Sequence, residues 1–373
     1  MRILVVAVLL IVLSSCNDNE PKRSNGFSSV EIKTLLKDSL LDVRAIEIMN
    51  DSVLIFPYNR FQINSYDILS ESGFYIDWLH SNYPIFDKDV DTLLGVGNIE
   101  PKEIRSIASN NKSLFLLNVE SPALINKVKM DTVLHANHRL QKVIEVDNHP
   151  KAFYDSMDFW NNQEGIAIGD PTDDCMSVII TRDSGETWTK LPCEDLPKTL
   201  DGEAAFAASD TNITIVDNHT WVATGGKASR ILYSPDKGAT WEVYDTPIIQ
   251  GKETTGMYSL DFYDAQHGFA IGGDYTQPND TIGNKIRTED GGKTWSVVAN
   301  GKGPGYRSCV QYVPNSNAKE LVAVGFKGID YTNNAGDSWK HLSDEGFYTI
   351  RFLNDSVAYA AGKGRISKLT FKN

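Results

Sequence analysis

Thr181-Arg-Asp-Ser-Gly-Glu-Thr-Trp188 is the first of four related stretches in the second half of this chain. The others are Ser234-Pro-Asp-Lys-Gly-Ala-Thr-Trp241, Thr288-Glu-Asp-Gly-Gly-Lys-Thr-Trp295 and Thr332-Asn-Asn-Ala-Gly-Asp-Ser-Trp339. All four follow the pattern S/T-x-D/N-x-G-x-T/S-W and recur about every 45 to 55 residues, a period typical of β-propeller blades. The repeat therefore predicts an all-β propeller, but a propeller scaffold by itself names no activity.

Each copy has the chemistry of a turn between two β-rich runs. The Asp or Asn side chain can accept backbone N–H bonds, the Gly allows a backbone angle that a Cβ would forbid, and the Trp starts the next strand. We therefore expect a structural role and no metal at these positions: Asp183, Gly185, Trp188, Asp236, Gly238, Trp241, Asp290, Gly292, Trp295, Asn334, Gly336 and Trp339. The pattern resembles the Asp-box of sialidases and related propellers, which implies an outer turn between the third and fourth strands of a blade, away from the ligand face.

Short apolar runs give the number of blades. Four runs that end in Gly, such as Gly165-Ile-Ala-Ile-Gly169, precede the four turns, and three similar runs lack a clear turn motif: residues 53–58, 114–119 and 357–362. Such runs suit strands that are buried on both faces. We predict seven four-stranded antiparallel blades, with six or eight as the open alternatives because the second unit is the most degenerate.

The end of the chain predicts how the ring closes. The last unit has only three strands, residues 347–352, 357–362 and 366–371, and an orphan run at residues 30–36 precedes the first unit. We expect this run to complete the last blade, which would remove an exposed sheet edge.

The N-terminus predicts the compartment. Met1-Arg2 is followed by an apolar run too short to span a membrane, and Leu13-Ser14-Ser15-Cys16 resembles a bacterial lipobox. This implies a signal peptide over residues 1–15, lipidation of Cys16, a polar tether over residues 16–29 and a propeller domain over residues 30–373. We expect a monomeric, extracytoplasmic protein that is attached to a bacterial membrane, on its periplasmic face or at the cell surface.

Cysteine spacing and charge add two expectations. Cys175 and Cys193 flank the first turn motif symmetrically, so they should face each other as a disulfide, which an extracytoplasmic compartment permits. The net charge of −13 argues against nucleic acid as a partner. Phosphate-loop, CxxC, HExxH and Gly-x-Ser-x-Gly motifs are missing from the sequence, and we expect no cofactor.

Polar residues recur at one position of the innermost strands. When the units are aligned on Val43-Arg-Ala-Ile-Glu47 and Phe347-Tyr-Thr-Ile-Arg351, this position holds Arg44, Arg105, Asp155, Glu203 or Ala204, Tyr258, Arg307 and Tyr348. Innermost strands line the central channel, so these side chains could form an anion-binding or catalytic group near its mouth. The alternative is a channel whose polar groups only satisfy one another. We expect the opposite rim, with the turn motifs, to be inert.

A wider resemblance covers about residues 40 to 370. The stretches at 153–160, 202–208, 257–274 and 303–308 resemble a family of secreted bacterial Asp-box propellers, whose members are labelled oxidoreductase, glycosyl hydrolase or photosystem II assembly-factor-like. Similarity to sialidases would imply an arginine triad of Arg44, Arg105 and Arg307, a nucleophile pair of Tyr258 or Tyr348 with Glu203, and Asp155 as the acid. The sialidase Arg-Ile-Pro signature is missing, since Ala45 and Ile46 follow Arg44.

Three functional hypotheses follow. The first is a lipoprotein that binds a partner protein or an acidic glycan at the channel face, and it is the preferred one. The second is a glycoside hydrolase of sialidase type, and the third is an oxidoreductase, which depends on family labels alone. Convergence of Arg44, Arg105 and Arg307 on one point would separate the first two.

Overall fold

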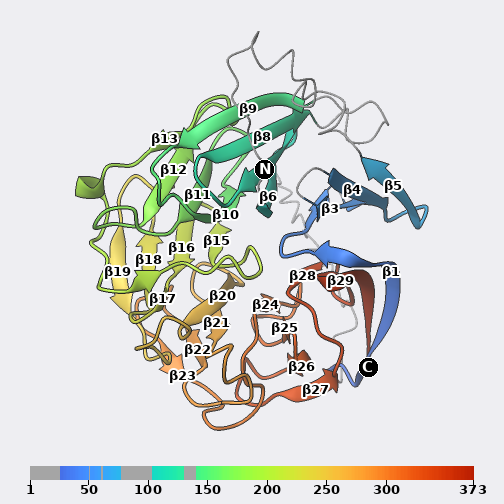
Figure 1. The fold of residues 1–373 in the computed structure, drawn as a ribbon. Coiled ribbons are helices and arrows are strands. Elements are labelled where there is room, and N and C mark those ends of the chain that lie inside the picture. Colours follow the sequence, from blue (N-terminus) through green and yellow to red (C-terminus); the bar gives the residue numbers. More distant parts are fainter. Residues whose placement is uncertain (1–25, 50, 60–61, 77–102, 130–139) are drawn as a thin grey trace, which may run out of the picture.

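A computed structural model describes residues 26–49, 51–59, 62–76, 103–129 and 140–373. The described chain forms an all-β ring of seven antiparallel blades around a central channel, as Figure 1 shows. It contains one short 3-10 helix, η2 (Cys193–Asp195), and within the same residues no helix is long and apolar enough to cross a membrane. The predicted lipidation site at Cys16 lies outside the described residues.

The blades follow the chain in order. Blade 1 is β2 (Glu47–Met49), β3 (Val53–Asn59), β4 (Gln62–Asp67) and β5 (Ser72–Ile76), and blade 2 is β6 (Ile104–Ser109), β7 (Ser113–Asn118), β8 (Ala123–Lys129) and β9 (Leu140–Asp147). Blade 3 is β10 (Tyr154–Phe159), β11 (Gly165–Gly169), β12 (Ser177–Thr181) and β13 (Thr189–Lys190). Blade 4 is β15 (Ile213–Val216), β16 (His219–Ala223), β18 (Arg230–Ser234) and β19 (Glu242–Asp245), preceded by a two-stranded ladder of β14 (Glu203–Ala204) and β17 (Gly225–Gly226).

The remaining blades complete the ring. Blade 5 is β20 (Met257–Phe262), β21 (Gly268–Gly272), β22 (Lys285–Thr288) and β23 (Ser296–Val297), and blade 6 is β24 (Cys309–Tyr312), β25 (Leu321–Gly325), β26 (Gly328–Thr332) and β27 (Lys340–Ser343). Blade 7 is β28 (Thr349–Phe352), β29 (Val357–Lys372) and β1 (Ser29–Asp42).

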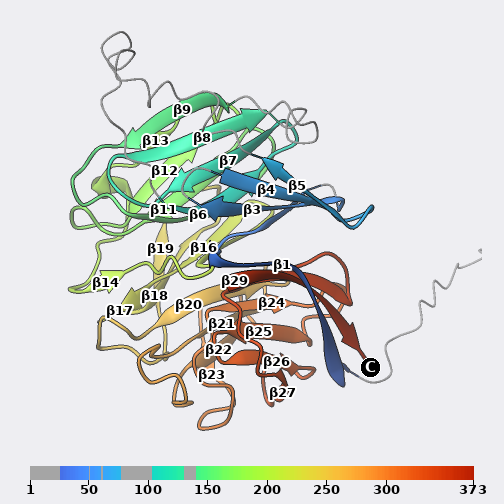
Figure 2. The same cartoon turned by 45° about the vertical axis from the view of Figure 1, so that its right-hand side comes forward.

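Blade 7 closes the ring as the sequence predicts. The long strand β29 folds back on itself, since Phe371 N donates to Ser356 O at 2.8 Å and Gly364 between them has φ of 78°. The first half of β29 pairs with β28, and the second half pairs with β1 through Val30↔Phe371 and Leu36↔Ile366. Figures 1 and 2 show β1 beside β29, so the two ends of the described chain share one sheet.

The hydrophobic core is divided among the contacts between blades. Over the described residues, seven clusters of buried apolar side chains each lie between two neighbouring blades. Between blades 3 and 4, for example, Ile166 and Ile168 pack with Val222 and Leu232. The second strands are buried on both faces because both neighbours cover them, which explains the continuous apolar runs in the sequence.

The four sequence motifs form equivalent turns between the third and fourth strands, and we call residues 181–188, 234–241, 288–295 and 332–339 the repeat turns. In the first, Thr187 donates to Asp183 through both its backbone N–H and its hydroxyl, at 2.9 and 2.6 Å. Burial opposes ionisation, but these hydrogen bonds outweigh it and hold the pKa of Asp183 below its usual value. Gly185 has φ of 73°, the left-handed region that the motif requires of it.

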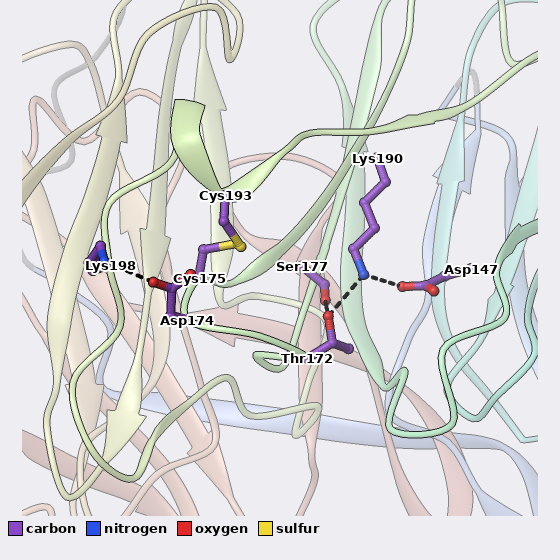
Figure 3. Close-up of a disulfide and its surroundings, with 8 residues drawn as sticks. All are labelled: Asp147, Thr172, Asp174, Cys175, Ser177, Lys190, Cys193 and Lys198. Carbon is purple, nitrogen blue, oxygen red and sulfur yellow. Dashed lines mark hydrogen bonds and ion pairs between the residues drawn. A yellow bond between two sulfur atoms is a disulfide. The ribbon is translucent and has the colours of Figure 1, made fainter.

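A disulfide joins Cys175 and Cys193, with 5.4 Å between their Cα atoms. Figure 3 shows it at the edge of blade 3, next to the ion pair of Lys198 with Asp174. The paired strand β12 begins after Cys175 and β13 ends before Cys193, so the bond joins the chain just beyond the paired strands.

Candidate functional site

The two ends of the channel differ in what surrounds them. In blades 3 to 6 the innermost strand ends in a hairpin turn that contacts the repeat turn of the same blade; in blade 3, Ser184 N donates to Gln163 O at 2.8 Å. The same contact recurs in blades 4, 5 and 6, from Lys237, Gly291 and Ala335. The repeat turns therefore mark one face of the ring, and the innermost strands begin at the other, which we call the mouth.

Three of the sequence-predicted site residues lie at the mouth, where the backbone has the same irregularity in three blades. The register between the first and second strands shifts by one residue around Arg105, Asp155 and Tyr258 in blades 2, 3 and 5. Each of these residues is the extra residue of a β-bulge, a feature that re-aims a side chain. The alignment of these three positions from the sequence therefore corresponds to one backbone geometry.

Two arginines and a tyrosine meet at the mouth. The Arg44 guanidinium carbon lies 4.3 Å from the centre of the Tyr348 ring, an arrangement that favours a cation–π contact. Burial and the Asp42 carboxylate raise the pKa of Tyr348, whereas Arg44 and Arg105 oppose the rise. Both guanidinium groups thus act on the same hydroxyl. The Nε atoms of Arg44 and Arg105 are buried and have no hydrogen-bond partner among the described residues.

Tyr258 and four aromatic side chains that the sequence did not single out extend this surface. Phe206 stacks on Tyr258 at 4.2 Å between ring centres, and Tyr306 meets Tyr258 edge to face at 4.8 Å. Tyr275 and Phe326 pack against Tyr306 and remain 48% and 41% exposed. We call these five side chains the aromatic cradle. Tyr258 lies on β20 at the repeat position, whereas the other four side chains lie outside the innermost strands, so no repeat position in the sequence reveals them.

Arg307 does not join the mouth, contrary to the sequence alignment. Its Nε and Nη2 atoms bind Asp330 on β26, and Nη1 donates to Tyr306 O at 2.7 Å. The equivalent of the bulged residue in blade 6 is Ser308, whose N–H bonds to Val324 O as Tyr348 N–H bonds to Ala361 O. The alignment was wrong by one residue, and a slip of one residue turns a strand side chain to the opposite face.

Glu203 does not join the mouth either. Its carboxylate forms a buried ion pair with Arg230, at 2.6 and 3.1 Å, and accepts a hydrogen bond from the Thr224 hydroxyl at 2.7 Å. The innermost strand of blade 4 is β15, and residues 205–210 occupy the place that a single bulged residue has elsewhere. Neither Glu203 nor Ala204 is therefore equivalent to Arg44.

Asp155 is close to the predicted place but is covered. It is 0% exposed, and neither carboxylate oxygen makes a hydrogen bond of normal geometry with a described residue. Burial raises its pKa well above the usual value, with a further rise from Asp170 and only partial opposition from Arg105. Burial therefore favours the protonated form of Asp155.

Residues 205–210, the channel loop, cross the channel. Ala207 O accepts from Arg105 Nη1 of blade 2 at 3.2 Å, and Ser209 Oγ donates to Ser308 O of blade 6 at 2.6 Å. Thr349 Oγ1 and Arg351 Nη2 of blade 7 donate to the carbonyls of Ser209 and Asp210, at 2.9 and 3.0 Å. The loop thus lies between the mouth and the rest of the channel.

Comparison with known proteins supports the fold. No family model and no curated protein matches the chain. Among solved structures, "YCF48 bound to D1 peptide" matches 93% of this chain and 96% of its own, with a TM-score of 0.60 and 10% identity. The WD40 repeats of RRP9 match 93% of this chain and 99% of their own, with a TM-score of 0.62 and 10% identity. A streptogramin B lyase matches 94% of this chain and 100% of its own, with a TM-score of 0.61 and 14% identity. At these identities the likeness shows a β-propeller and no activity.

Proposed function

We propose that this propeller is a binding module that holds an acidic peptide segment of a partner protein at its mouth. The observation that carries the proposal is the pairing of Arg44 and Arg105 beside the aromatic cradle. Arginine binds carboxylates through a fork of N–H donors, and exposed Tyr and Phe side chains are typical anchors of peptide interfaces. A propeller of similar fold has been solved with a bound peptide, YCF48 with the D1 peptide, and this supports a peptide as the kind of ligand.

An acidic glycan is the second candidate ligand, because it carries the same carboxylate chemistry. The residues at the mouth do not favour hydrolysis of such a glycan. The sialidase-like hypothesis needs three arginines and a glutamate at the mouth. Arg307 is bound to Asp330 and Glu203 to Arg230, so neither side chain is available there. The oxidoreductase hypothesis gains no support from the residues of the mouth.

The binding proposal is tested with a library of acidic peptides that end in a carboxylate or an amide, and with sialylated glycans. We expect Arg44→Ala and Arg105→Ala each to weaken binding of the best peptide about ten- to a hundredfold, because each removes a charge-assisted contact of about 1.5–3 kcal/mol. Arg182→Ala is the matched control, since Arg182 lies on a repeat turn at the opposite face and binds Glu164 at 2.8 Å. Equal weakening by all three variants, or selective loss with Arg182→Ala alone, would contradict the proposal.

We further propose that the protein is extracytoplasmic and lipid-anchored through Cys16. The support is the leader sequence, together with the disulfide of Cys175 and Cys193, which oxidising compartments favour. In the native host, we expect Cys16→Ala to abolish incorporation of labelled lipid and to move the protein out of the membrane fraction. Cys309→Ala is the control, because Cys309 is a buried thiol inside the fold. Lipid labelling that survives Cys16→Ala would refute the anchor.

A further inference from the structure

The channel contains a second polar region, beyond the channel loop and toward the repeat turns. A cavity of about 150 Å³ lies there. Five blades supply charged or amide side chains to its lining from one shared position of the innermost strand, three residues after the mouth position, and the channel loop supplies one more. These residues are Glu47, Asp158, Asp261, Gln311, Arg351 and Asp210, and the hydroxyl side chains of Thr211 and Thr214 complete the polar lining. We call this cavity the acidic chamber.

The acidic chamber has more negative than positive groups. Four carboxylates face one guanidinium, that of Arg351. Arg351 donates to Thr349 Oγ1 and Ile350 O, both at 2.9 Å, and to the backbone carbonyl of Asp210, while its closest carboxylate oxygen is Asp210 Oδ2 at 4.0 Å. Most of the hydrogen bonds of the arginine therefore go to neutral groups, and the carboxylates keep an unbalanced charge when they are ionised.

Asp210 independently indicates a missing partner. It is 6% exposed, and Oδ2 accepts the Ile107 N–H at 3.1 Å. Oδ1 has no hydrogen bond of normal geometry within the described part of the chain, although the Ser106 hydroxyl lies nearby. A buried carboxylate oxygen without a donor is costly, so this atom calls for a proton or a bound donor.

Hydrogen bonds hold the other three carboxylates of the chamber in position. Asp261 accepts the N–H groups of Phe262 and Tyr312 at 3.0 and 2.7 Å, and Asp158 accepts that of Phe159 at 2.7 Å. Glu47 accepts the Ser109 hydroxyl at 2.6 Å. Backbone N–H groups and one hydroxyl fix these oxygens on different walls without neutralising them, which prepares the chamber for a positive ligand.

The distribution of the carboxylates selects the kind of cation. Across the described residues, no three His, Cys, Asp or Glu side chains are placed to hold one metal ion. A guanidinium or ammonium group instead spreads several N–H donors over separated acceptors. A volume of about 150 Å³ also suits a group the size of benzene.

We propose that the acidic chamber binds an organic cation, a guanidinium or primary ammonium group, which enters from the face that carries the repeat turns. The channel loop covers the chamber on the mouth side, so this site is distinct from the peptide site proposed above. The proposal departs from the expectation that the repeat-turn face is inert.

Protonation governs the affinity of such a site. Burial raises the pKa of Asp210 to about 8, those of Glu47 and Asp261 to about 7, and that of Asp158 to about 6. Arg351 opposes each rise, and Gln311 is neutral. A cation competes with these protons, so binding strengthens as the pH rises from 5.5 to 8 and releases protons.

The test is calorimetry on the whole protein at pH 5.5 and pH 8, with guanidinium, ethylammonium, agmatine, and the blocked amides of lysine and arginine as probes. We expect at least one probe to bind at pH 8 with a Kd of about 1 mM or tighter, and at least tenfold more weakly at pH 5.5. If the small cations and the blocked amino acids all bind, the site recognises the cationic group alone. If only blocked lysine or arginine binds, the natural ligand is a side chain of a partner protein. Magnesium and calcium are titrated in the same way to test for binding of metal ions.

Variants locate the site. Asp158→Asn and Asp261→Asn should each weaken binding at least tenfold, whereas Asp217→Asn, which removes an exposed carboxylate from the turn between β15 and β16, should not change it. Proton release, measured in two buffers of different ionisation enthalpy, tests the wild-type protein even where a variant fails to fold. Arg44→Ala should leave the affinity intact, which separates this site from the mouth. The proposal is overturned by the lack of any binding at pH 8, by unchanged binding in both Asp158→Asn and Asp261→Asn, or by binding of metal ions alone.

Discussion

Arg307 and Asp210 are similarly buried, 4% and 6% exposed, but have different surroundings. Arg307 has a complete set of acceptors in Asp330 and Tyr306, so its charge is used inside the fold. Asp210 has one anchored oxygen and one without a partner. At the scale of residues, groups with unused hydrogen-bonding capacity can act on a ligand. Asp210 is such a group in the chamber. At the mouth, the Nε atoms of Arg44 and Arg105 keep this capacity, although Arg105 Nη2 binds Glu103 at 2.9 Å.

Asp210 also predicts a pH dependence of stability. Its pKa of about 8 in the folded chain lies above the usual value of an unfolded aspartate, about 3.9. The folded state therefore binds the proton more tightly, and this contribution to stability is complete below about pH 4 and is lost as the pH rises through about 8. We expect the melting temperature to fall between pH 5 and pH 8, and Asp210→Asn to flatten the fall and raise the melting temperature at pH 8 by a few degrees.

Differential scanning calorimetry at four pH values checks this. Asp217→Asn, in an exposed turn, is the control and should keep the slope of the wild-type protein. If Asp210→Asn keeps that slope as well, the raised pKa of Asp210 is wrong.

The repeat turn is the smallest element that the sequence specifies completely. Its side-chain hydrogen bonds join residues two to four positions apart, and the bond from the backbone N–H four residues further on occurs in all four copies, to Asp183, Asp236, Asp290 and Asn334. The Thr hydroxyl also donates to each Asp, whereas Asn334 Nδ2 donates to the Ser338 hydroxyl. Because every partner is local, the turn forms the same structure wherever the motif occurs.

This locality predicts an asymmetric result for two substitutions. Asp236 accepts hydrogen bonds from Ser234, from Thr240 N and from the Thr240 hydroxyl, at 3.0, 2.8 and 2.7 Å. Asp236→Ala removes all three and should lower the free energy of unfolding by about 1–3 kcal/mol. Asn334→Asp keeps the accepting oxygen and should stay within about 0.5 kcal/mol of the wild-type value. Urea unfolding measures both, and equal effects would show that the side-chain acceptor does not stabilise the turn.

For the whole molecule, the seam of blade 7 decides whether the ring is closed. β1 comes from one end of the described chain and pairs with β29 from the other, and Val30 and Ile32 pack against the core between blades 6 and 7. Ring closure therefore depends on contacts between residues more than 300 positions apart, such as Ser28 with Lys372.

Deletion of residues 26–36 tests the seam. It should expose the edge of β29, lower the melting temperature and cause aggregation, because an unpaired strand edge recruits other chains. Deletion of residues 17–25, which keeps β1, is the matched control and should leave both properties unchanged. Light scattering and thermal unfolding compare them, and a monomeric, equally stable product of the longer deletion would contradict the role of the seam.

The sequence by itself determined the blades, the repeat turns, the seam of residues 30–36 and the candidate pairing of Cys175 with Cys193. These features depend on strand patterning, local turn chemistry and spacing along the chain, which short stretches of sequence contain. The same alignment that located Arg44 and Tyr348 also contained Glu47, Asp158, Asp261 and Arg351 three residues further on, so the charged lining that the innermost strands supply was readable from the repeat. Gln311 takes this position only after blade 6 is shifted by one residue, from Arg307 to Ser308.

Only the tertiary structure decided which polar residues remain available for a ligand. The slip that removes Arg307 from the mouth depends on strand register, and the capture of Glu203 by Arg230 depends on two segments that meet in space. The channel loop, the aromatic cradle and the unpaired oxygen of Asp210 arise where blades far apart in the sequence face one channel. Such contacts carry no periodic signal along the chain, because each forms once and across the ring.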